Sequence, residues 1–257
     1  MLLSFDHGPV RELRLNRPPA NALSPELILA LREAIEVAPQ KGCRALILSG
    51  SPGRFSGGLD VPLLLGFGQA EIATLWREFY ALLKALAVSP IPIAAAITGH
   101  APAGGTVLPL FCDMRFMAEG DFKIGLNEVQ VGIPLPPVIV VALRRLVGAR
   151  QAERLAVSGA LISPPEALAA GLIDELTPPG DVVERALIWC QALLALPPGA
   201  MAATRREARA DLTAYFDRNL EAELQVVSAS WWANETQTTL HALTAKLGKK
   251  TAATSKP

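Results

Sequence analysis

Short apolar runs alternate with longer amphipathic stretches over most of the chain. Residues 10–15, VRELRL, alternate with a period of two and predict a half-buried strand. Residues 44–50 and 91–99 are nearly continuous apolar runs, which are typical of buried strands, and a further strand is expected to start near Cys112. Because helical patterns separate these runs, the sequence predicts an α/β fold with largely parallel strand pairing.

The amphipathic stretches predict the helices between the strands. Residues 24–38 place Ser24 as an N-cap directly before Pro25, and their apolar positions recur with the period of a helix. Residues 70–89 predict a long amphipathic helix that ends before Pro90. Further helical patterns follow at residues 137–146, 149–157, 164–170 and 181–195.

The pattern changes after LPPGA, residues 196–200, and is entirely helical beyond it. The sequence therefore predicts a core over residues 1–196 and a helical C-terminal region over residues 197–257, which ends in a frayed tail, GKKTAATSKP. This region contains Trp231 and Trp232, which a small appendage could hardly bury alone, so we expect it to mediate self-association.

Composition and charge exclude several classes of function. The chain has 257 residues, of which 51% are apolar, and its 24 basic and 24 acidic residues give no net charge. Nucleic acid is therefore not an expected partner. The three cysteines and three histidines show no metal-binding spacing, so no metal is expected. Without a signal-peptide pattern or an apolar run of about 18 residues, we expect a cytoplasmic protein with no membrane partner.

A glycine turn after the strand predicted at residues 44–50 is the first candidate for chemistry. In the segment RFSGGLDV, Gly57 and Gly58 follow Ser56 and let the backbone turn sharply and approach a ligand closely. The N–H of Leu59 is then free to point outward. An SGG sequence alone is typical of any tight turn, so it gains meaning only from a second site of the same kind.

The segment HAPAGGTVLPLFCD, residues 100–113, repeats this layout after another buried strand. The chain passes from Ala103 through Gly104 into a helical run whose first N–H groups have no partner within the helix. One N–H from each turn could hold a single oxygen atom that becomes negative, which is the arrangement of an oxyanion hole.

Four segments, LNRPPANALS, FSGGLD, TGHAPAGG…CD and GLNEVQVGI, occur in this order, and the chain resembles the enoyl-CoA hydratase/isomerase (crotonase) superfamily over residues 3–195. The resemblance implies a spiral of ββα units with a C-terminal helical trimerisation region, and a homotrimer or a dimer of trimers. It also implies an acyl-CoA thioester ligand whose carbonyl lies between the N–H groups of Leu59 and Gly104. Coenzyme A is then part of the substrate, and no cofactor is expected. The substrate-binding residues expected around these donors are Ser56, Gly57, Gly58, Asp60, Ala103, Val107 and Asn127.

The helix after the second turn carries no acid. Crotonase-type hydratases use two glutamates around a water molecule, and the resemblance places one of them at Val107 and the other at Glu128. In this respect the chain resembles the mitochondrial-type Δ3,Δ2-enoyl-CoA isomerases more closely than the hydratases. A single carboxylate can take a proton from C2 of a 3-enoyl-CoA and deliver one to C4. An apolar surrounding would keep water away and raise the carboxyl pKa of Glu128.

Several polar residues keep open roles. Asn127 either lines the acyl site or shapes its turn, and Asp60 is interpreted as the cap of the next helix. His100 is interpreted as a hydrogen-bonded turn residue. Arg54 meets a CoA phosphate or is merely solvated. Residues 61–67, VPLLLGF, fit an acyl tunnel and a plain core equally well.

Two rival functions remain. One is another crotonase chemistry, either hydration or thioester hydrolysis, which needs a water-activating group besides Glu128. The other is a non-catalytic homologue that binds acyl-CoA. The two glycine turns together with Glu128 count against the second rival, because a pure binding protein has no need of a positioned carboxylate.

Overall fold

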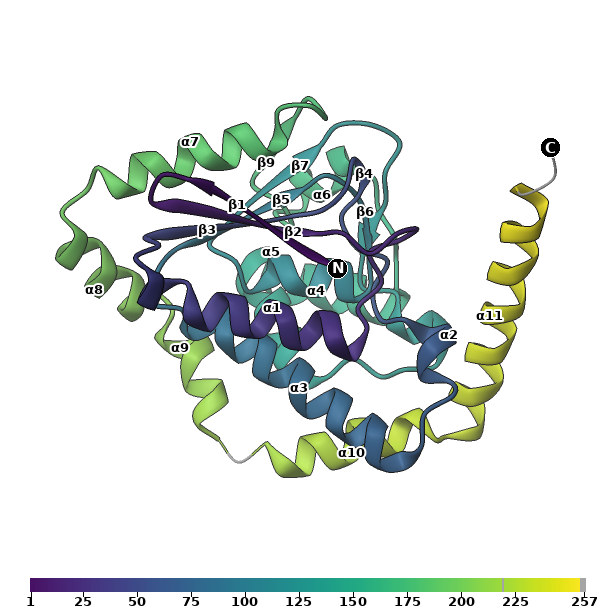
Figure 1. The fold of residues 1–257 in the computed structure, drawn as a ribbon. Coiled ribbons are helices and arrows are strands. Elements are labelled where there is room, and N and C mark those ends of the chain that lie inside the picture. The colour runs from purple at the N-terminus through teal and green to yellow at the C-terminus, as the bar shows by residue number, and fades with distance from the viewer. Residues whose placement is uncertain (219, 255–257) are drawn as a thin grey trace.

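The centre of the fold is a six-stranded sheet in a computed structural model that describes residues 1–218 and 220–254. Its strands are β1 (Leu2–His7), β2 (Val10–Leu15), β3 (Ala45–Ser49), β5 (Ile93–Ile97), β7 (Met114–Ala118) and β9 (Glu175–Thr177). They lie in the order β1-β2-β3-β5-β7-β9 (Figure 1). Neighbouring strands are parallel except β1 and β2, which form an antiparallel hairpin.

A smaller parallel sheet contains β4 (Gly53–Arg54), β6 (Gly99–Pro102) and β8 (Ile124–Gly125), in that order. Each of these short strands follows a strand of the large sheet, and a helical segment comes next along the chain. This is the repeated ββα unit that the resemblance implies. Because the three short strands are parallel neighbours, the segments that leave their carboxyl ends meet at one edge.

Helices cover both faces of the large sheet. They are α1 (Pro25–Val37), α2 (Val61–Leu64), α3 (Gln69–Val88), α4 (Gly104–Leu110), α5 (Pro137–Ser158), α6 (Pro164–Ala169) and α7 (Val182–Leu194), with the 3₁₀ turns η1 (Pro39–Lys41) and η2 (Glu128–Val131). In Figure 1, α7 lies on one face, and α1 and α3 lie on the other. Strand β3 is buried along its whole length for this reason, which explains its continuous apolar sequence.

Local signals placed most of these helices correctly. The side chain of Ser24 accepts a hydrogen bond from Leu27 N at 3.3 Å and caps α1 as predicted. Gly148 interrupts α5 with a φ of 74°, so the two helical patterns predicted there are two helices separated by a break. Strand β1 has no counterpart in the predictions. It is an edge strand whose residues are largely exposed, so its sequence lacks the alternation that marks a half-buried strand.

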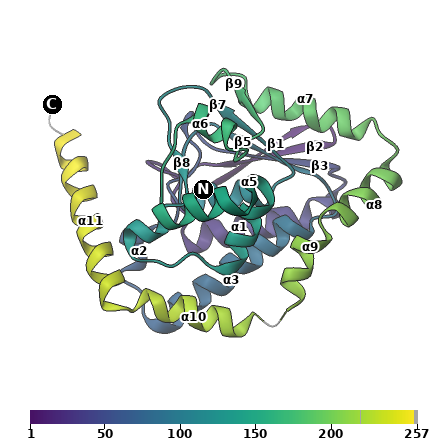
Figure 2. The ribbon, with the colours of Figure 1, turned by 180° about the vertical axis from the view of Figure 1, so that it is seen from behind.

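The C-terminal region contains α8 (Pro198–Ala208), α9 (Ala210–Thr213), η3 (Ala214–Asp217), α10 (Glu221–Trp231) and α11 (Asn234–Thr254). These elements run from the end of α7 around the layer formed by α1 and α3 to the opposite side of the molecule (Figures 1 and 2). No single helix among the described residues is long and apolar enough to cross a membrane. Helices α7 and α8 pass that test only as a pair, bent by 112°.

The structure differs from the predictions for this region in the tail and in the burial of Trp231, and self-association itself stays a prediction. Helix α11 continues through Thr254, so most of the segment predicted as a frayed tail is helical, in keeping with its content of alanine and lysine. Residues 255–257 lie outside the described residues. Trp231 is only 1% exposed within a single chain, whereas Trp232 is 37% exposed. Helix α10 packs against α3, and this contact already gives Trp231 a buried environment.

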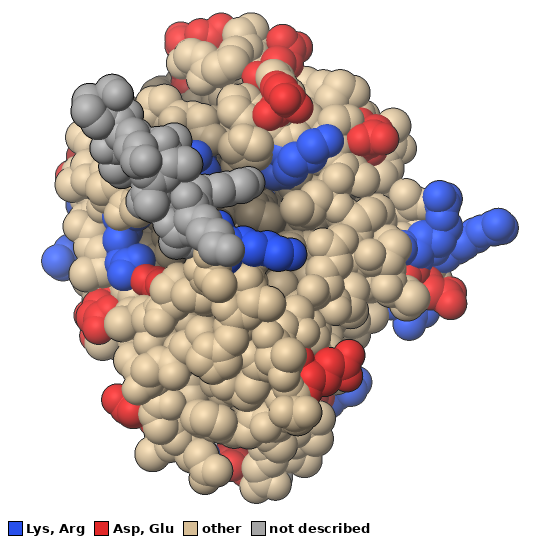
Figure 3. All heavy atoms as spheres, turned by 90° about the vertical axis from the view of Figure 1, so that its right-hand side faces the viewer, with Lys and Arg blue, Asp and Glu red and all other residues tan. Residues whose placement is uncertain are grey.

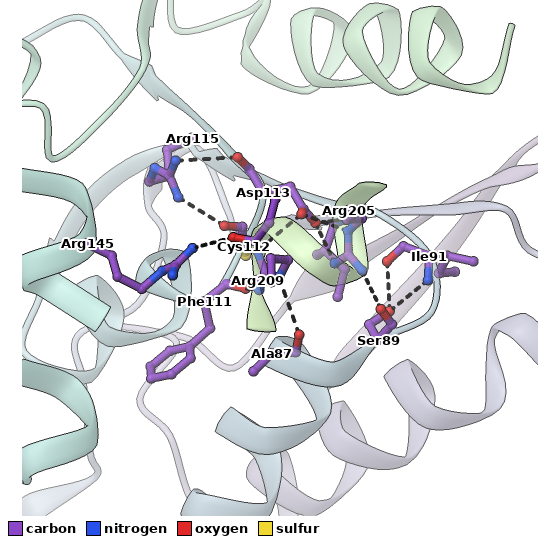
Figure 4. Close-up of polar contacts among 12 residues, drawn as sticks. Ala87, Ser89, Ile91, Phe111, Cys112, Asp113, Arg115, Arg145, Arg205 and Arg209 are labelled. Carbon is purple, nitrogen blue, oxygen red and sulfur yellow. Dashed lines mark hydrogen bonds and ion pairs between the residues drawn. The ribbon is translucent and has the colours of Figure 1, made fainter. Parts of the chain in front are cut away.

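Asp113 joins the C-terminal region to the core (Figure 4). Its two carboxylate oxygens each accept a hydrogen bond from Arg205 at 2.8 Å, and Oδ1 also accepts one from Arg209 at 3.1 Å. Oδ2 accepts a further bond from Ile93 N, at the start of β5, at 2.8 Å. Arg209 in turn donates to the carbonyl of Phe111 at 2.6 Å, directly after α4. One carboxylate therefore fastens α8 to the central sheet.

Removing this charge should destabilise the whole protein. In Asp113→Asn, Arg205 and Arg209, whose side chains are only 12% and 10% exposed, would lose their shared counter-charge. We expect the free energy of unfolding, measured by urea denaturation, to fall by about 3–5 kcal/mol. Asp211→Asn is the matched control, because Asp211 pairs with Arg145 but is 64% exposed. Exposed pairs contribute about 1 kcal/mol or less, so equal losses in the two variants would contradict the role given to Asp113.

Candidate active site

The two glycine turns predicted from the sequence lie directly against each other. Gly58 has a φ of +82°, and a Cβ atom on it would stand 3.0 Å from Ala103 Cβ and 3.1 Å from Gly104 N. A Cβ atom on Gly104 would in turn stand 3.2 Å from Gly58 Cα. The contact arises because the turns follow the parallel neighbours β4 and β6. Backbone meets backbone here, and a side chain on Gly58 would intrude between the turns.

The two turns leave backbone N–H groups without a partner among the described residues. In the first turn the group is that of Leu59, and in the second turn the groups are those of Gly104 and Gly105. On either side of Leu59 the backbone is engaged, since Gly58 N donates to Ser56 Oγ at 3.2 Å and Asp60 N donates to the carbonyl of Leu23 at 3.2 Å. Unpaired backbone donors are rare in folded proteins and call for a ligand or solvent as acceptor.

The backbone of Ala103 holds the second turn in an unusual conformation. Its φ of 49° and ψ of −123° lie in a region that residues other than glycine rarely adopt. Its N–H donates to the carbonyl of Gly125 at 2.8 Å, and its own carbonyl accepts from Thr106 N at 2.7 Å. Such strain persists only where the surroundings fix it, and it is concentrated at functional sites.

The hydroxyl group of Thr106 connects this turn to the next strand. It donates to the carbonyl of Ala101 at 2.5 Å and accepts from Gly125 N at 2.8 Å. It therefore ties the start of α4 to β6 and β8 together. Sequence reasoning missed this residue, although a threonine directly after two glycines at a helix start is a recognisable signal for such a contact.

Other predicted site residues take supporting positions. Ser56 is 1% exposed, and its hydroxyl donates to the carbonyl of Asn21 at 2.8 Å, so it braces the first turn from behind. Gly57, at the surface of this turn, donates its N–H to the carbonyl of Ala20 at 2.8 Å. Asp60 accepts from Leu63 N at 3.2 Å, which confirms that it caps α2.

The remaining candidates divide between surface and core. Asp60 also pairs with Arg17 at 2.6 Å. Arg54 is exposed, and Nδ1 of His100 accepts a hydrogen bond from Lys123 N at 3.1 Å, as expected for a turn residue. Val107 is 1% exposed and belongs to the hydrophobic core on α4. The place that the resemblance gives to a hydratase glutamate is therefore occupied by an aliphatic side chain.

Glu128 and Asn127 lie just beyond β8, where η2 begins. Glu128 as a whole is half-buried, yet its Oε2 atom is shielded from solvent and has no hydrogen-bond partner. Oδ1 of Asn127 is buried without a partner in the same way. Two unsatisfied oxygens on consecutive residues indicate a place for a ligand or a water molecule.

Burial raises the pKa of Glu128 to about 7, against a weaker opposing effect of its own backbone N–H. This agrees with the expectation of an apolar surrounding for this carboxyl group. A group with such a pKa exchanges protons readily near neutrality. The edge of the small sheet thus combines the unpaired N–H groups of Leu59 and Gly104 with one carboxyl group whose pKa is near 7.

The enoyl-CoA hydratase/isomerase family model matches residues 6–250. The chain belongs to this family. It is 34% identical over 248 residues to enoyl-CoA delta isomerase 1, mitochondrial, of Mus musculus, covering 95% of this chain and 86% of that relative. It is also 38% identical over 197 residues to a probable enoyl-CoA hydratase of Mycobacterium avium, covering 75% of each.

The fold agrees with the family. The crystal structure of human mitochondrial delta3-delta2-enoyl-CoA isomerase matches with a TM-score of 0.92 at 31% identity, over 97% of this chain and 98% of that chain. The protein is therefore a crotonase-fold enzyme of the hydratase/isomerase family. Within the described part of the chain, no group of three or more His, Cys, Asp or Glu side chains is arranged to hold a metal ion.

The raised pKa of Glu128 should make stability depend on pH in this family member. The folded pKa of about 7 exceeds the ordinary value of 4.5, so the folded protein keeps a proton that the unfolded chain has already lost. The stabilisation from this proton is fully present below about pH 4.5 and is lost as the pH rises through about 7. The loss in the free energy of unfolding is on the order of 3 kcal/mol.

Glu128→Gln should therefore be more stable than the wild type at about pH 8, and of similar stability at about pH 4.5. Urea denaturation at both pH values measures the difference. Glu119→Gln, which changes an exposed acid on the nearby surface, is the control and should show no such pH dependence. An absence of any gain in the Glu128 variant at the higher pH would show that burial does not penalise this carboxylate.

Proposed function

We propose that the protein is a Δ3,Δ2-enoyl-CoA isomerase, which moves the double bond of a 3-enoyl-CoA to give the 2-trans-enoyl-CoA. The observation that carries this proposal is the buried, unpartnered carboxyl oxygen of Glu128 with its pKa near 7. Support also comes from the two backbone donors at Leu59 and Gly104, and from relatives and a solved structure that are themselves named as enoyl-CoA isomerases.

The reaction needs a base at C2 and an acid at C4. In the proposed mechanism the thioester oxygen accepts hydrogen bonds from Leu59 N–H and Gly104 N–H. The Glu128 carboxylate removes a proton from C2, and the electron pair of that C–H bond moves toward the thioester, giving a dienolate whose oxygen the two donors stabilise. The carboxylic acid then returns the proton to C4, the thioester carbonyl re-forms, and the double bond lies between C2 and C3.

The balance of this reaction requires no oxidant, reductant or water. Coenzyme A is part of the substrate, and no further cofactor is proposed. Val107 supports isomerisation over hydration, because the family resemblance places the second hydratase glutamate there, and a buried valine cannot activate a water molecule. The hydratase named among the relatives makes hydration the rival that the assay must separate.

The surface around α11 fits an anionic ligand. Lysine and arginine side chains border a hollow on the face that α11 occupies (Figure 3). Coenzyme A carries several phosphates, and positive charge around an entrance attracts such a ligand. The expected substrate contacts of Gly57, Gly58, Ala103 and Asn127 remain part of this proposal.

A homotrimer or dimer of trimers is also proposed. Support comes from the family resemblance and from two exposed apolar side chains, Val157 on α5, which is 74% exposed, and Trp232 after α10, which is 37% exposed. Light scattering at micromolar concentration checks it, and a clean monomer would refute it.

A turnover assay tests the isomerase directly. With 3-hexenoyl-CoA or 3-dodecenoyl-CoA the absorbance of the conjugated enoyl thioester should rise, whereas hydration of a 2-enoyl-CoA would lower it. Glu128→Gln should reduce kcat by about 10²–10⁴-fold, because it cannot carry the proton. Faster hydration of 2-enoyl-CoA than isomerisation by the wild type would refute the proposal, as would an active Glu128→Gln enzyme.

Gly104→Ala tests the oxygen-binding donors in the same assay. The added Cβ would press on Gly58 Cα and on the side chain of Leu23, at 3.2 and 3.0 Å, and so displace one donor from the other. We expect kcat to fall by about 10²–10³-fold. Gly199→Ala is the matched control, since nothing lies within 4 Å of a Cβ there. Near-native turnover by Gly104→Ala would remove Gly104 from the mechanism.

A further inference from the structure

The 3₁₀ turn η2, which carries Glu128, is held from two sides. On one side, Gln130 Nε2 donates to the carbonyl of Gly159 at 2.8 Å, where the second part of α5 ends. Gly159 has no side chain to interfere, and a Cβ atom there would stand 2.7 Å from Val129 Cγ2. On the other side η2 meets α11, the last helix of the C-terminal region.

The contact with α11 is a close approach of two backbones. Gly132 ends η2 with a φ of +74°, and a Cβ atom on it would stand 3.0 Å from Thr236 Cα. The hydroxyl group of Thr236 donates to the carbonyl of Gly132 at 2.5 Å. Thr236 is 1% exposed, and Leu240, one helical turn further on, is fully buried. The first turn of α11 therefore rests on the end of the loop.

This hydrogen bond continues to Glu128 through one peptide group. The carbonyl of Gly132 and the N–H of Ile133 belong to the same peptide unit, and Ile133 N donates to the carbonyl of Glu128 at 3.0 Å. A peptide whose carbonyl accepts a bond donates more strongly through its N–H, so the two bonds reinforce each other. Thr236 is thus two hydrogen bonds away from the backbone of Glu128, although the two residues lie far apart in the sequence.

Helix α11 also packs on α2, the short helix that follows Leu59. One C-terminal helix therefore borders both parts of the candidate site, the turn that carries a free N–H and the turn that carries the carboxyl group. A side chain on α11 that binds η2 is therefore well placed to set the position of Glu128 relative to the turn that contains Leu59.

We propose that Thr236 is a positioning residue, whose hydroxyl holds the Gly132–Ile133 peptide and thereby fixes where the Glu128 carboxyl group stands. The effect on turnover rests on the proposed isomerase function, whereas the positioning of Glu128 does not.

Thr236→Val removes the hydroxyl and keeps the shape of the side chain. In the isomerase assay we expect kcat to fall about five- to tenfold, as for the loss of one hydrogen bond, with KM within about twofold of the wild type. Thr236→Ser should restore kcat, because it restores the donor. Thr239→Val is the matched control, since the Thr239 hydroxyl donates at 2.8 Å to the carbonyl of Glu235 within α11, and no hydrogen bond of this side chain to η2 is present among the described residues. Should the valine variant not fold, Thr236→Ala makes the same comparison.

The pKa of Glu128 supplies a readout that does not depend on turnover. It is measured by NMR of ¹³C-labelled glutamate in the ligand-free protein, and Glu128→Gln identifies the signal. A loosened η2 would let water reach Oε2, so in Thr236→Val the pKa should move from about 7 toward the ordinary 4.5, while Thr239→Val leaves it unchanged.

The outcomes separate the two proposals. An unchanged pKa of Glu128 and an unchanged kcat in Thr236→Val, even with a lower thermal stability, would overturn the positioning role. A shifted pKa in a protein whose wild type has no isomerase activity would support that role and refute the proposed function.

Discussion

The contact between the Gly58 and Gly104 backbones is the constraint on which the candidate site depends. Glycines occupy the tightest contacts between the strands and turns of this edge. A Cβ atom on Gly99 would stand 2.0 Å from the carbonyl carbon of Gly53, and one on Gly105 would stand 2.3 Å from the carbonyl oxygen of Ser56. Only glycine permits such distances. The short sheet thus brings the backbones of the two turns together, and neither turn has a reactive side chain at the contact.

The surroundings must hold such a site in place, because it contains a strained backbone conformation and buried polar atoms without partners, both of which cost free energy. Ala103 lies in a strained backbone conformation, and Oε2 of Glu128 and Oδ1 of Asn127 are buried without partners. Buried hydroxyl groups at Thr106 and Thr236 provide part of that support, each binding backbone that leads to Glu128. The Asp113 cluster acts further away, since it anchors the start of the C-terminal region whose last helix reaches η2.

The sequence predicted those features that depend on neighbours along the chain. The apolar runs located β3 and β5, the Ser24 cap located α1, and the glycine motifs located both turns. Contacts between distant segments left no local pattern. The burial of Trp231 depends on the packing of α10 against α3. The hydrogen bond from Thr236 to the carbonyl of Gly132 joins residues 104 positions apart. Edge strand β1 was not predicted for a different reason: both of its faces are largely exposed, so its sequence need not alternate between apolar and polar residues.

A single buried carboxyl group explains why the missing acid at Val107 suits the proposed chemistry. A second glutamate there would place two like charges near one ligand, and one of them would have to be protonated or solvated by water. Water at that position competes for the conjugated product. Val107 lies in the core, so under the proposed mechanism the proton taken from C2 stays on Glu128 until it is delivered to C4. The burial that raises the pKa of Glu128 would, under the proposed mechanism, also keep this proton from exchanging with water, and both effects depend on the packing of η2 against its neighbours.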